Sequence, residues 1–260
     1  MGVDSNGEDA VNDLTYIMLK VTELLRIRDP NVTARYYYGK NPQEYINRVS
    51  EVILNTKAVP ALYNDAANIE ALIGQGESLE HARDYAVVGC VELASNGRDY
   101  PASSSIMLNL ASSLEMALFC GKRPITGEEQ IGPVTPNPAE MKSFDEFRQA
   151  FFTQLDWLVE QAIDLNEQFG AIHQEIMPSP ILSAFFEGPL EKGKDLIQGG
   201  AIYNSSGATH IGFAGVTDSL NAIEQAIFTE KKFSFSELIE AIKADFSRPG
   251  DEKMQIYLEC

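Results

Sequence analysis

One long amphipathic segment constrains the fold of this chain more than any other feature of the sequence. Its apolar side chains recur at three- and four-residue steps, which is the spacing of a single helix face. Ser143 and Glu146 stand at its start in the Ser-x-x-Glu order of a capping box. The apolar face consists of Phe147, Phe151, Leu155, Leu158 and Ala162. The segment therefore predicts the longest helix of the chain and a helix-rich fold.

The same periodicity predicts two helices near the N-terminus. The first should end before Asp29-Pro30 and bury one apolar stripe. That stripe consists of Val11, Leu14, Met18, Val21 and Leu25. The second should begin with Asn41 as its N-cap and Pro42 at its first position, because both residues are favoured there.

Three further helix starts are visible later in the chain. Ser78 should open a short helix, and the capping box of Ser234 and Glu237 should open the last one. Between them, a helix should follow the polar segment 96–101. Its apolar face would consist of Ile106, Leu110, Leu114 and Ala117. Helices are thus expected in every part of the chain.

The strands are predicted in short apolar segments and in segments that glycines interrupt. Residues 85–88 are apolar and compatible with a β-strand, and glycines interrupt the chain repeatedly after Pro180. Residues 124–142 are rich in Pro and Gly, and we interpret them as a long surface connection and not as a domain boundary. Many helices mixed with short strands favour an α/β fold in which residues 1–260 form a single domain.

Charge and hydropathy argue against two classes of partner. The 260 residues include 38 acidic and 20 basic ones, so the net charge is −18. The electrostatic field of this negative charge repels the phosphate backbone of a nucleic acid. No run of Lys and Arg residues provides a basic surface that would offset the repulsion. No apolar run approaches the about 18 to 20 residues that a membrane helix requires. We therefore expect neither a nucleic-acid partner nor a membrane partner.

The cysteines indicate a reducing compartment. Cys90, Cys120 and Cys260 are widely spaced and form no CxxC pair. They also form no metal-ligand pattern with the histidines, so no bound metal is expected. Because an odd number of cysteines in a chain of this length argues against a disulfide framework, we expect a cytoplasmic protein.

The segment Gly89-Cys90-Val91-Glu92 carries the most distinctive chemistry. In an extended chain, Cys90 and Glu92 would point to the same side and face one cavity. A neighbouring carboxylate raises the pKa of a thiol, which makes the pair a poor ionic nucleophile. The pair suits a neutral S–H that exchanges a hydrogen atom beside a carboxylate that takes a proton. The alternative is a cysteine that packs as a small apolar residue next to a solvated glutamate.

These four residues resemble the thiyl-radical loop of the glycyl radical enzymes, the superfamily of pyruvate formate-lyase and the glycerol and choline lyases. Several other segments resemble the family in the same order along nearly the whole chain. They are Asn12-Asp13-Leu14-Thr15-Tyr16, Pro60-Ala61-Leu62-Tyr63-Asn64-Asp65, Ala82-Arg83-Asp84-Tyr85, Gly199-Gly200-Ala201-Ile202-Tyr203-Asn204 and Asp218-Ser219-Leu220-Asn221-Ala222-Ile223.

The resemblance implies a fold, a site and a partner. The fold would be part of a ten-stranded α/β barrel with the cysteine loop at its centre. Cys90 would become the thiyl radical that abstracts a substrate hydrogen atom, and Glu92 would be the general base. The chain itself would bind no cofactor. A glycyl radical on a separate segment would be installed by an activase that uses S-adenosylmethionine and an iron–sulfur cluster.

The resemblance also implies an incomplete domain, because the N-terminal part of the barrel and the C-terminal glycyl loop are not found in this sequence. Missing barrel segments or a second copy are therefore expected partners, and the isolated chain is expected to be inactive. The expected activity is that of an anaerobic dehydratase or C–C, C–N or C–S lyase acting on a small hydroxylated substrate. One alternative is a formate C-acetyltransferase, although that mechanism uses two adjacent cysteines and residue 89 is Gly. The other is a truncated or split chain without catalytic activity.

One further residue is a candidate for substrate binding. Ser103 begins a run of three serines just before the helix expected to carry Ile106. Its hydroxyl could bind substrate or could cap that helix, and capping is the more common role for serine at such a position.

Overall fold

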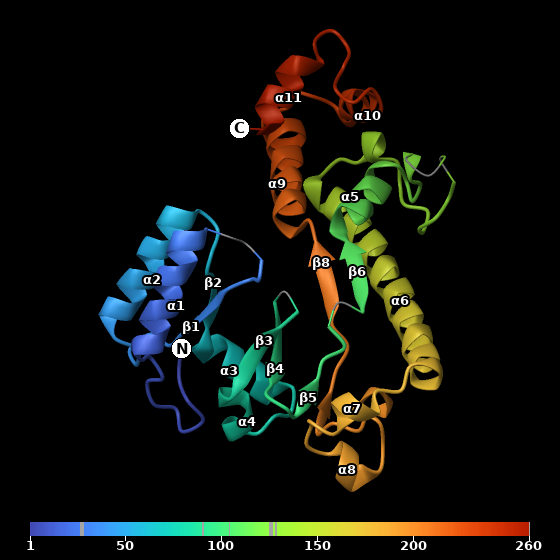
Figure 1. Cartoon of the computed structure of the whole chain (residues 1–260). Coiled ribbons are helices and arrows are strands. Elements are labelled where there is room, and N and C mark those ends of the chain that lie inside the picture. Colours follow the sequence, from blue (N-terminus) through green and yellow to red (C-terminus); the bar gives the residue numbers. More distant parts are fainter. Residues whose placement is uncertain (27–28, 90, 104, 125–126, 128, 260) are drawn as a thin grey trace. The chain divides into compact units, whose positions relative to one another are not determined.

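The computed structural model describes residues 1–26, 29–89, 91–103, 105–124, 127 and 129–259 (Figure 1). The chain divides into two compact units. Unit 1 comprises Met1–Ser103 and Ile172–Gly207, and unit 2 comprises Ser104–Ala171 and Ala208–Cys260. That residues 1–260 form one incomplete domain of a larger barrel stays a prediction.

Unit 1 is built from short strand pairs and the helices that connect them. β1 and β2 pair in parallel with Ala34 opposite Leu62, and α2 connects them, so β1–α2–β2 is a βαβ unit. β3 and β4 form an antiparallel hairpin, whereas β5 and β7 pair in parallel from distant parts of the chain. The elements are α1 (Asp13–Leu25), β1 (Thr33–Tyr36), α2 (Gln43–Thr56), β2 (Ala61–Asn64), α3 (Asp65–Gly74), α4 (Leu79–Arg83), β3 (Tyr85–Val88), β4 (Glu92–Ser95), β5 (Asp99–Tyr100), α7 (Pro180–Ser183), α8 (Pro189–Lys192), η3 (Leu196–Gln198) and β7 (Tyr203–Asn204).

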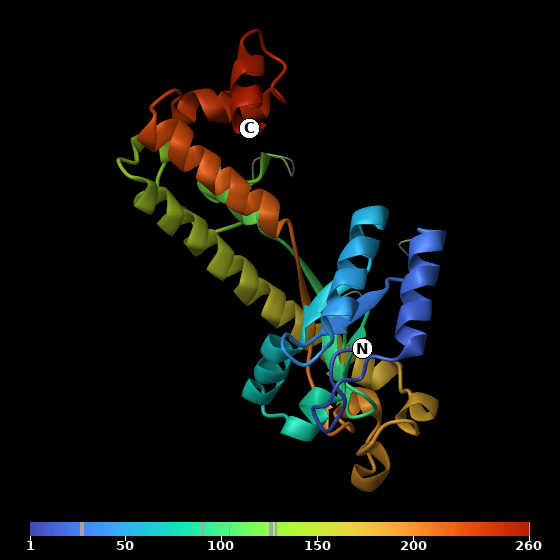
Figure 2. The same ribbon diagram turned by 90° about the vertical axis from the view of Figure 1, so that its left-hand side faces the viewer.

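Unit 2 consists mainly of helices around one parallel strand pair. β6 and β8 pair with Leu108 opposite His210, and α9 runs beside the long α6 (Figure 2). The elements are β6 (Ile106–Asn109), α5 (Leu110–Leu118), η2 (Pro138–Glu140), α6 (Phe144–Ile176, assigned to this unit up to Ala171), β8 (Ala208–Ile211), α9 (Phe213–Ile223), the π-helical η4 (Glu224–Thr229), α10 (Phe235–Lys243) and α11 (Asp251–Glu259). These helices and parallel pairs confirm the α/β class and the helix-rich character.

The long helix begins where the capping pattern predicts. The Ser143 hydroxyl accepts a hydrogen bond from the Glu146 amide (3.3 Å), and the Glu146 carboxylate accepts one from the Lys142 amide (2.9 Å). Phe147 and Phe151 of the predicted stripe are buried in the core of unit 2 together with Phe235 of α10. Since this burial removes large apolar surfaces from water, it provides much of the stability of the unit.

The apolar stripe predicted for the first helix is wrong. α1 buries Thr15, Leu19 and Thr22 instead, and Leu19 belongs to a core with residues of α2. The exposed fractions of Leu14 and Leu25 are 64% and 58%. The contact with α2 selects the face that carries Leu19, and the more apolar face is left in contact with solvent.

Two predicted helix starts also differ from the structure. Pro42 is the N-cap residue of α2, and Asn41 is buried with its side-chain NH2 donating to the Gly2 carbonyl and to Asp9, both at 2.7 Å. Ile106 lies in β6 and not in a helix, because residues 106–109 pair with β8. The helix predicted there begins at Leu110, with Asn109 as its N-cap. In both places, a partner far along the chain overrides the local pattern.

No helix among the described residues is long and apolar enough to cross a membrane.

Candidate functional site

The hairpin formed by β3 and β4 presents the motif that the sequence singles out. Val88, the last residue of β3, is paired with Glu92, the first residue of β4, so residues 89–91 form a three-residue loop. Gly89 adopts a φ of +57°, a region that side-chain-bearing residues rarely enter. The backbone therefore departs from the extended conformation at Gly89. Cys90 lies outside the described residues, and its predicted place beside Glu92 stays a prediction.

The Glu92 carboxylate folds back over this loop. Its Oε2 atom accepts a hydrogen bond from the backbone N–H of Val91 at 3.0 Å, and the side chain is half-buried. An amide that donates to a carboxylate stabilises its charged form and fixes its direction. The geometry thus places a carboxylate at the loop of the hairpin, and the role of Glu92 as a proton acceptor stays a prediction.

Ser103 lies against the same loop. A Cβ atom added to Gly89 would overlap Ser103 Oγ and would be 2.8 Å from Glu92 Oε2. The serine hydroxyl and the glutamate carboxylate thus converge on the bare Cα of Gly89. Ser103 is exposed, and it does not cap α5, because Asn109 does so. The capping role is therefore wrong for Ser103, and its role in substrate binding stays a prediction.

A ladder of backbone hydrogen bonds positions the strand that leads to Ser103. The amides of Tyr203, Ser205 and Gly207 donate to the carbonyls of Arg98, Tyr100 and Ala102, at 2.9, 3.1 and 3.3 Å. This ladder extends the pairing of β5 with β7 up to the residue before Ser103. The glycine-rich segment after residue 199 therefore serves to hold the serine in place.

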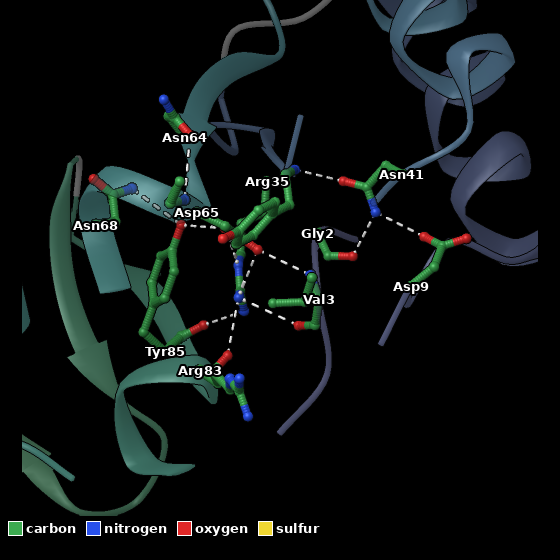
Figure 3. A network of polar contacts seen from close by, with 12 residues as sticks. Gly2, Val3, Asp9, Arg35, Asn41, Asn64, Asp65, Asn68, Arg83 and Tyr85 are labelled. Atoms are coloured by element: carbon green, nitrogen blue, oxygen red, sulfur yellow. Dashed lines mark hydrogen bonds and ion pairs between the residues drawn. The ribbon is translucent and has the colours of Figure 1, made fainter. Parts of the chain in front are cut away.

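A buried ion pair anchors β3 beneath the loop (Figure 3). Arg35 and Asp65 pair through Nε–Oδ1 (2.9 Å) and Nη2–Oδ2 (3.0 Å), and the Asp65 side chain is completely buried. The guanidinium also donates to the carbonyls of Arg83 and Tyr85 at 2.9 and 2.7 Å. The Tyr85 hydroxyl donates to Asp65 Oδ1 at 2.7 Å. One arginine thus joins β1, α3 and the first residue of β3.

The same group of contacts reaches the N-terminal segment. The Val3 amide donates to Asp65 Oδ2 at 2.9 Å, and the Val3 carbonyl accepts from Arg35. Burial, with a smaller contribution from Asp65, raises the pKa of Tyr85 above its usual value, so its hydroxyl remains a donor. Sequence reasoning missed this network, although Asp65 and Tyr85 both stand in the segments that resemble the glycyl radical enzymes.

A second buried polar cluster lies where β4 meets β5. Glu77 accepts a hydrogen bond from Ser95, and the His81 Nδ1 atom lies 2.9 Å from the Tyr203 hydroxyl. Asp99 is 6% exposed, and its Oδ1 atom has no hydrogen-bond partner within the described residues. Burial, followed by the nearby Glu77 charge, raises the pKa of Asp99 to about 6. The charge of Asp99 in the folded chain therefore changes near pH 6.

Metal binding and an apolar cavity are two other features that could indicate a site. Among the described residues, no group of three or more His, Cys, Asp or Glu side chains is placed to hold a metal ion. A cavity of about 330 Å³ in unit 2 is lined mostly by apolar residues of α5, α9 and α10, such as Leu114 and Ile223. Because the β3–β4 hairpin carries the motif that the sequence singles out, with Glu92 and Ser103 beside Gly89, we take the hairpin as the candidate site.

Comparisons with known proteins find similar sequences along nearly the whole chain. The family model described as pyruvate formate lyase-like matches residues 1–258. The (2S)-3-sulfopropanediol dehydratase of Klebsiella oxytoca is 37% identical over 97% of this chain and 30% of its own length.

Two solved structures are similar throughout the chain. The glycerol-bound B12-independent glycerol dehydratase of Clostridium butyricum has a TM-score of 0.85 and 35% identity, over 98% of this chain and 32% of that one. A glycyl radical enzyme from Archaeoglobus fulgidus has a TM-score of 0.80 and 33% identity, over 98% and 32%. The chain therefore spans about a third of these relatives, and the likeness confirms the expected fold, part of an α/β barrel of the glycyl radical type.

Proposed function

The chain belongs to the pyruvate formate lyase-like family of glycyl radical enzymes, and we propose that it provides the thiyl loop of a dehydratase for a small hydroxylated substrate. Two of the similar proteins are by name dehydratases, of a sulfopropanediol and of glycerol. A compound with hydroxyl groups on adjacent carbons is therefore the substrate class that we infer.

One observation supports this proposal above the others, namely that Glu92 and Ser103 converge on Gly89 next to the cysteine position. A carboxylate can accept the proton of a substrate hydroxyl, and a serine hydroxyl can bind a second one. No histidine is needed, because the proposed reaction uses Cys90 as a hydrogen-atom carrier and not as a thiolate.

The proposed reaction begins at the substrate carbon that carries a hydroxyl group. The Cys90 thiyl takes the hydrogen atom of that carbon, which makes an S–H bond and leaves a carbon radical. Glu92 accepts the proton of the hydroxyl, so that electron density can displace the hydroxyl on the adjacent carbon. The displaced hydroxyl group takes up the proton that Glu92 returns and leaves as water. The product radical then takes back the hydrogen atom from Cys90 and restores the thiyl.

Three further parts belong to this proposal. A protein glycyl radical, installed by an activase that uses S-adenosylmethionine and an iron–sulfur cluster, supplies the unpaired electron.

Further barrel segments or a second copy of the chain complete the cavity. The exposed apolar face of α1, which includes Leu14 and Leu25, fits a partner that covers it. A cytoplasmic, anaerobic setting suits chemistry that oxygen would quench.

The alternative of a formate C-acetyltransferase is less well supported. That mechanism requires a second thiol next to Cys90, and residue 89 is Gly. The alternative of a chain without catalytic activity would leave the convergence of Glu92 and Ser103 without a purpose.

The test is turnover by the activated, complete enzyme under anoxia. The chain is co-expressed with the remaining family segments and an activase, and aldehyde formation from glycerol and 1,2-propanediol is measured. We expect turnover that is abolished in Cys90→Ser. Equal turnover by Cys90→Ser contradicts the proposal, and exchange of labelled formate into pyruvate would favour the acetyltransferase.

A further inference from the structure

The cluster where β4 meets β5 contains a buried carboxyl group without a hydrogen-bond donor. Asp99 is 6% exposed, and its Oδ1 atom has no partner within the described residues. Glu77 is also buried, but its carboxylate accepts a hydrogen bond from Ser95. A donor stabilises the charged form of a carboxyl group, whereas burial without a donor favours the protonated form. The geometry therefore favours a charged Glu77 beside a protonated Asp99.

The side chains that face Asp99 include a second carboxylate. Asp99 is paired with Tyr203, so both side chains lie on the same face of the β5–β7 pair. Glu77 approaches this face from the connection between α3 and α4, and its charge acts on Asp99. From α4, His81 places its Nδ1 atom 2.9 Å from the Tyr203 hydroxyl.

The neighbouring arginine does not compensate for these charges. The Arg98 guanidinium pairs with Asp84 and with Glu187, both at 3.1 Å. Among the described residues, no ion pair includes Asp99. Two carboxyl groups that share a buried place without a cation cannot both be charged without a large cost in free energy. One proton is therefore part of the folded cluster, and Asp99 holds it.

The strand that pairs with β5 belongs to a segment with its own internal contacts. This segment, residues 179–205, contains α7, α8, η3 and β7. Asp195 accepts hydrogen bonds from the Ser179 amide at 2.8 Å and from the Ser183 hydroxyl at 3.1 Å. The Asn204 side chain donates to the Ala201 carbonyl at 2.9 Å. These bonds do not involve β5, so they can persist when β7 separates from β5.

The β5–β7 pairing is where this segment lies beside Asp99. Each strand is two residues long, and the amides of Tyr203 and Ser205 provide the ladder bonds. The Tyr203 hydroxyl also accepts the Ser78 amide at 3.2 Å. Separation of the strands would remove Tyr203 from the face that carries Asp99. Water could then reach the carboxylate, and its charged form would be stable there.

We propose that Asp99 and Glu77 form a pH-dependent switch: the β5–β7 pairing stays closed while Asp99 holds a proton, and loss of this proton opens the pairing and frees segment 179–205. Burial and the Glu77 charge raise the pKa of Asp99 from 3.8 to about 6. The closed pairing is therefore most stable below about pH 4 and loses stability as the pH rises through about 6. The inference goes beyond the proposed function and does not depend on it, because it concerns only the folding of unit 1.

Amide hydrogen exchange measures the opening in the 260-residue chain. The protection factors of Tyr203 and Ser205, corrected for the intrinsic effect of pH on exchange, are compared at pH 5 and pH 7. We expect both to fall about tenfold, as follows from a pKa of about 6 in the closed state and 3.8 in the open state. The Ala61 amide, which donates to the Val32 carbonyl at 2.9 Å, should keep its protection factor. Constant protection of Tyr203 and Ser205, or an equal fall at Ala61, overturns the proposal.

Three variants identify the group that titrates. Asp99→Asn should remove the fall in protection between pH 5 and pH 7, because the amide cannot ionise. Glu77→Gln removes the neighbouring charge and should make the fall smaller. Glu80→Gln, at an exposed position of α4, is the matched control and should retain the tenfold fall. A full tenfold fall in either Asp99→Asn or Glu77→Gln overturns the proposal, and Glu77→Gln decides if Asp99→Asn does not fold.

Discussion

Arg35 and Asp65 form a bidentate ion pair in which the carboxylate is wholly withdrawn from water. The remaining acceptor capacity of Asp65 is met by the Tyr85 hydroxyl and the Val3 amide. A buried charge with all partners present is tolerated, but a buried charge that loses its partner is strongly destabilising. The pair therefore supports β3 and, through it, the hairpin that carries the candidate site.

Replacing Arg35 should show how much the hairpin depends on this pair. We expect Arg35→Met to lower the free energy of unfolding by about 3 to 5 kcal/mol, because Asp65 is then left buried without a cation. Chemical denaturation measures the loss. As a control, Arg148→Ala removes an exposed pair with Asp145 and should change stability by less than about 1 kcal/mol. A loss below 1 kcal/mol in Arg35→Met would show that the network is not needed for folding.

Glu92→Gln tests the proton acceptor. The amide keeps the shape of the side chain and removes its basic site, so turnover of the activated enzyme should fall by about two to four orders of magnitude. The thermal stability should stay close to that of the unsubstituted protein. Glu44→Gln, at an exposed position in the first turn of α2, is the control that should keep full turnover. Activity of Glu92→Gln within a few-fold of the unsubstituted enzyme would remove Glu92 from the reaction.

Ser103→Ala tests the binding role of the serine. Loss of one hydrogen bond to a substrate hydroxyl should raise KM by about tenfold, which corresponds to about 1.4 kcal/mol of binding free energy. Because Ser103 is exposed and caps no helix, the melting temperature should hardly change. Steady-state kinetics with glycerol provide the measurement. An unchanged KM would show that the hydroxyl does not contact substrate.

Asp99 should make the stability of unit 1 depend on pH. Its pKa of about 6 in the folded chain lies above the ordinary value of 3.8, so the folded state binds more protons than the unfolded state between these values. Stability therefore falls as the pH rises from about 4 through about 6, and the loss is complete above that range. Glu77, whose charge faces Asp99, contributes to the raised pKa.

The corresponding measurement compares Asp99→Asn with the unsubstituted chain at several pH values. The variant lacks the ionisation, so its stability relative to the unsubstituted chain should increase from pH 4 to pH 7 by up to about 3 kcal/mol, at about 1.4 kcal/mol for each pKa unit. Asp145→Asn, at an exposed position of α6, should show no comparable trend. A constant difference between Asp99→Asn and the unsubstituted chain across this range would contradict the raised pKa.

The sequence alone predicts the features of this protein that depend on near neighbours in the chain. The capping box of Ser234 and Glu237 forms as expected, with the Glu237 carboxylate accepting the Ser234 amide at 2.8 Å. Ser78 caps α4, and residues 85–88 form β3. The capping contacts join residues three positions apart, and β3 pairs with the strand that follows it within a hairpin, so the local pattern contains most of the information that these elements need. The family resemblance likewise follows from short motifs in a fixed order.

Tertiary structure decided the features that depend on distant partners. Pairing with β8 makes Ile106 part of a strand and moves the helix start to Leu110, which in turn frees Ser103 from capping. Contact with α2 selects the buried face of α1 against its more apolar stripe. The pairing of Arg35 with Asp65 and the convergence of Glu92 and Ser103 on Gly89 also have no local signal. Their energies arise only when the chain brings these residues together, because ladder bonds, burial and ion pairs depend on separation in space and not in sequence.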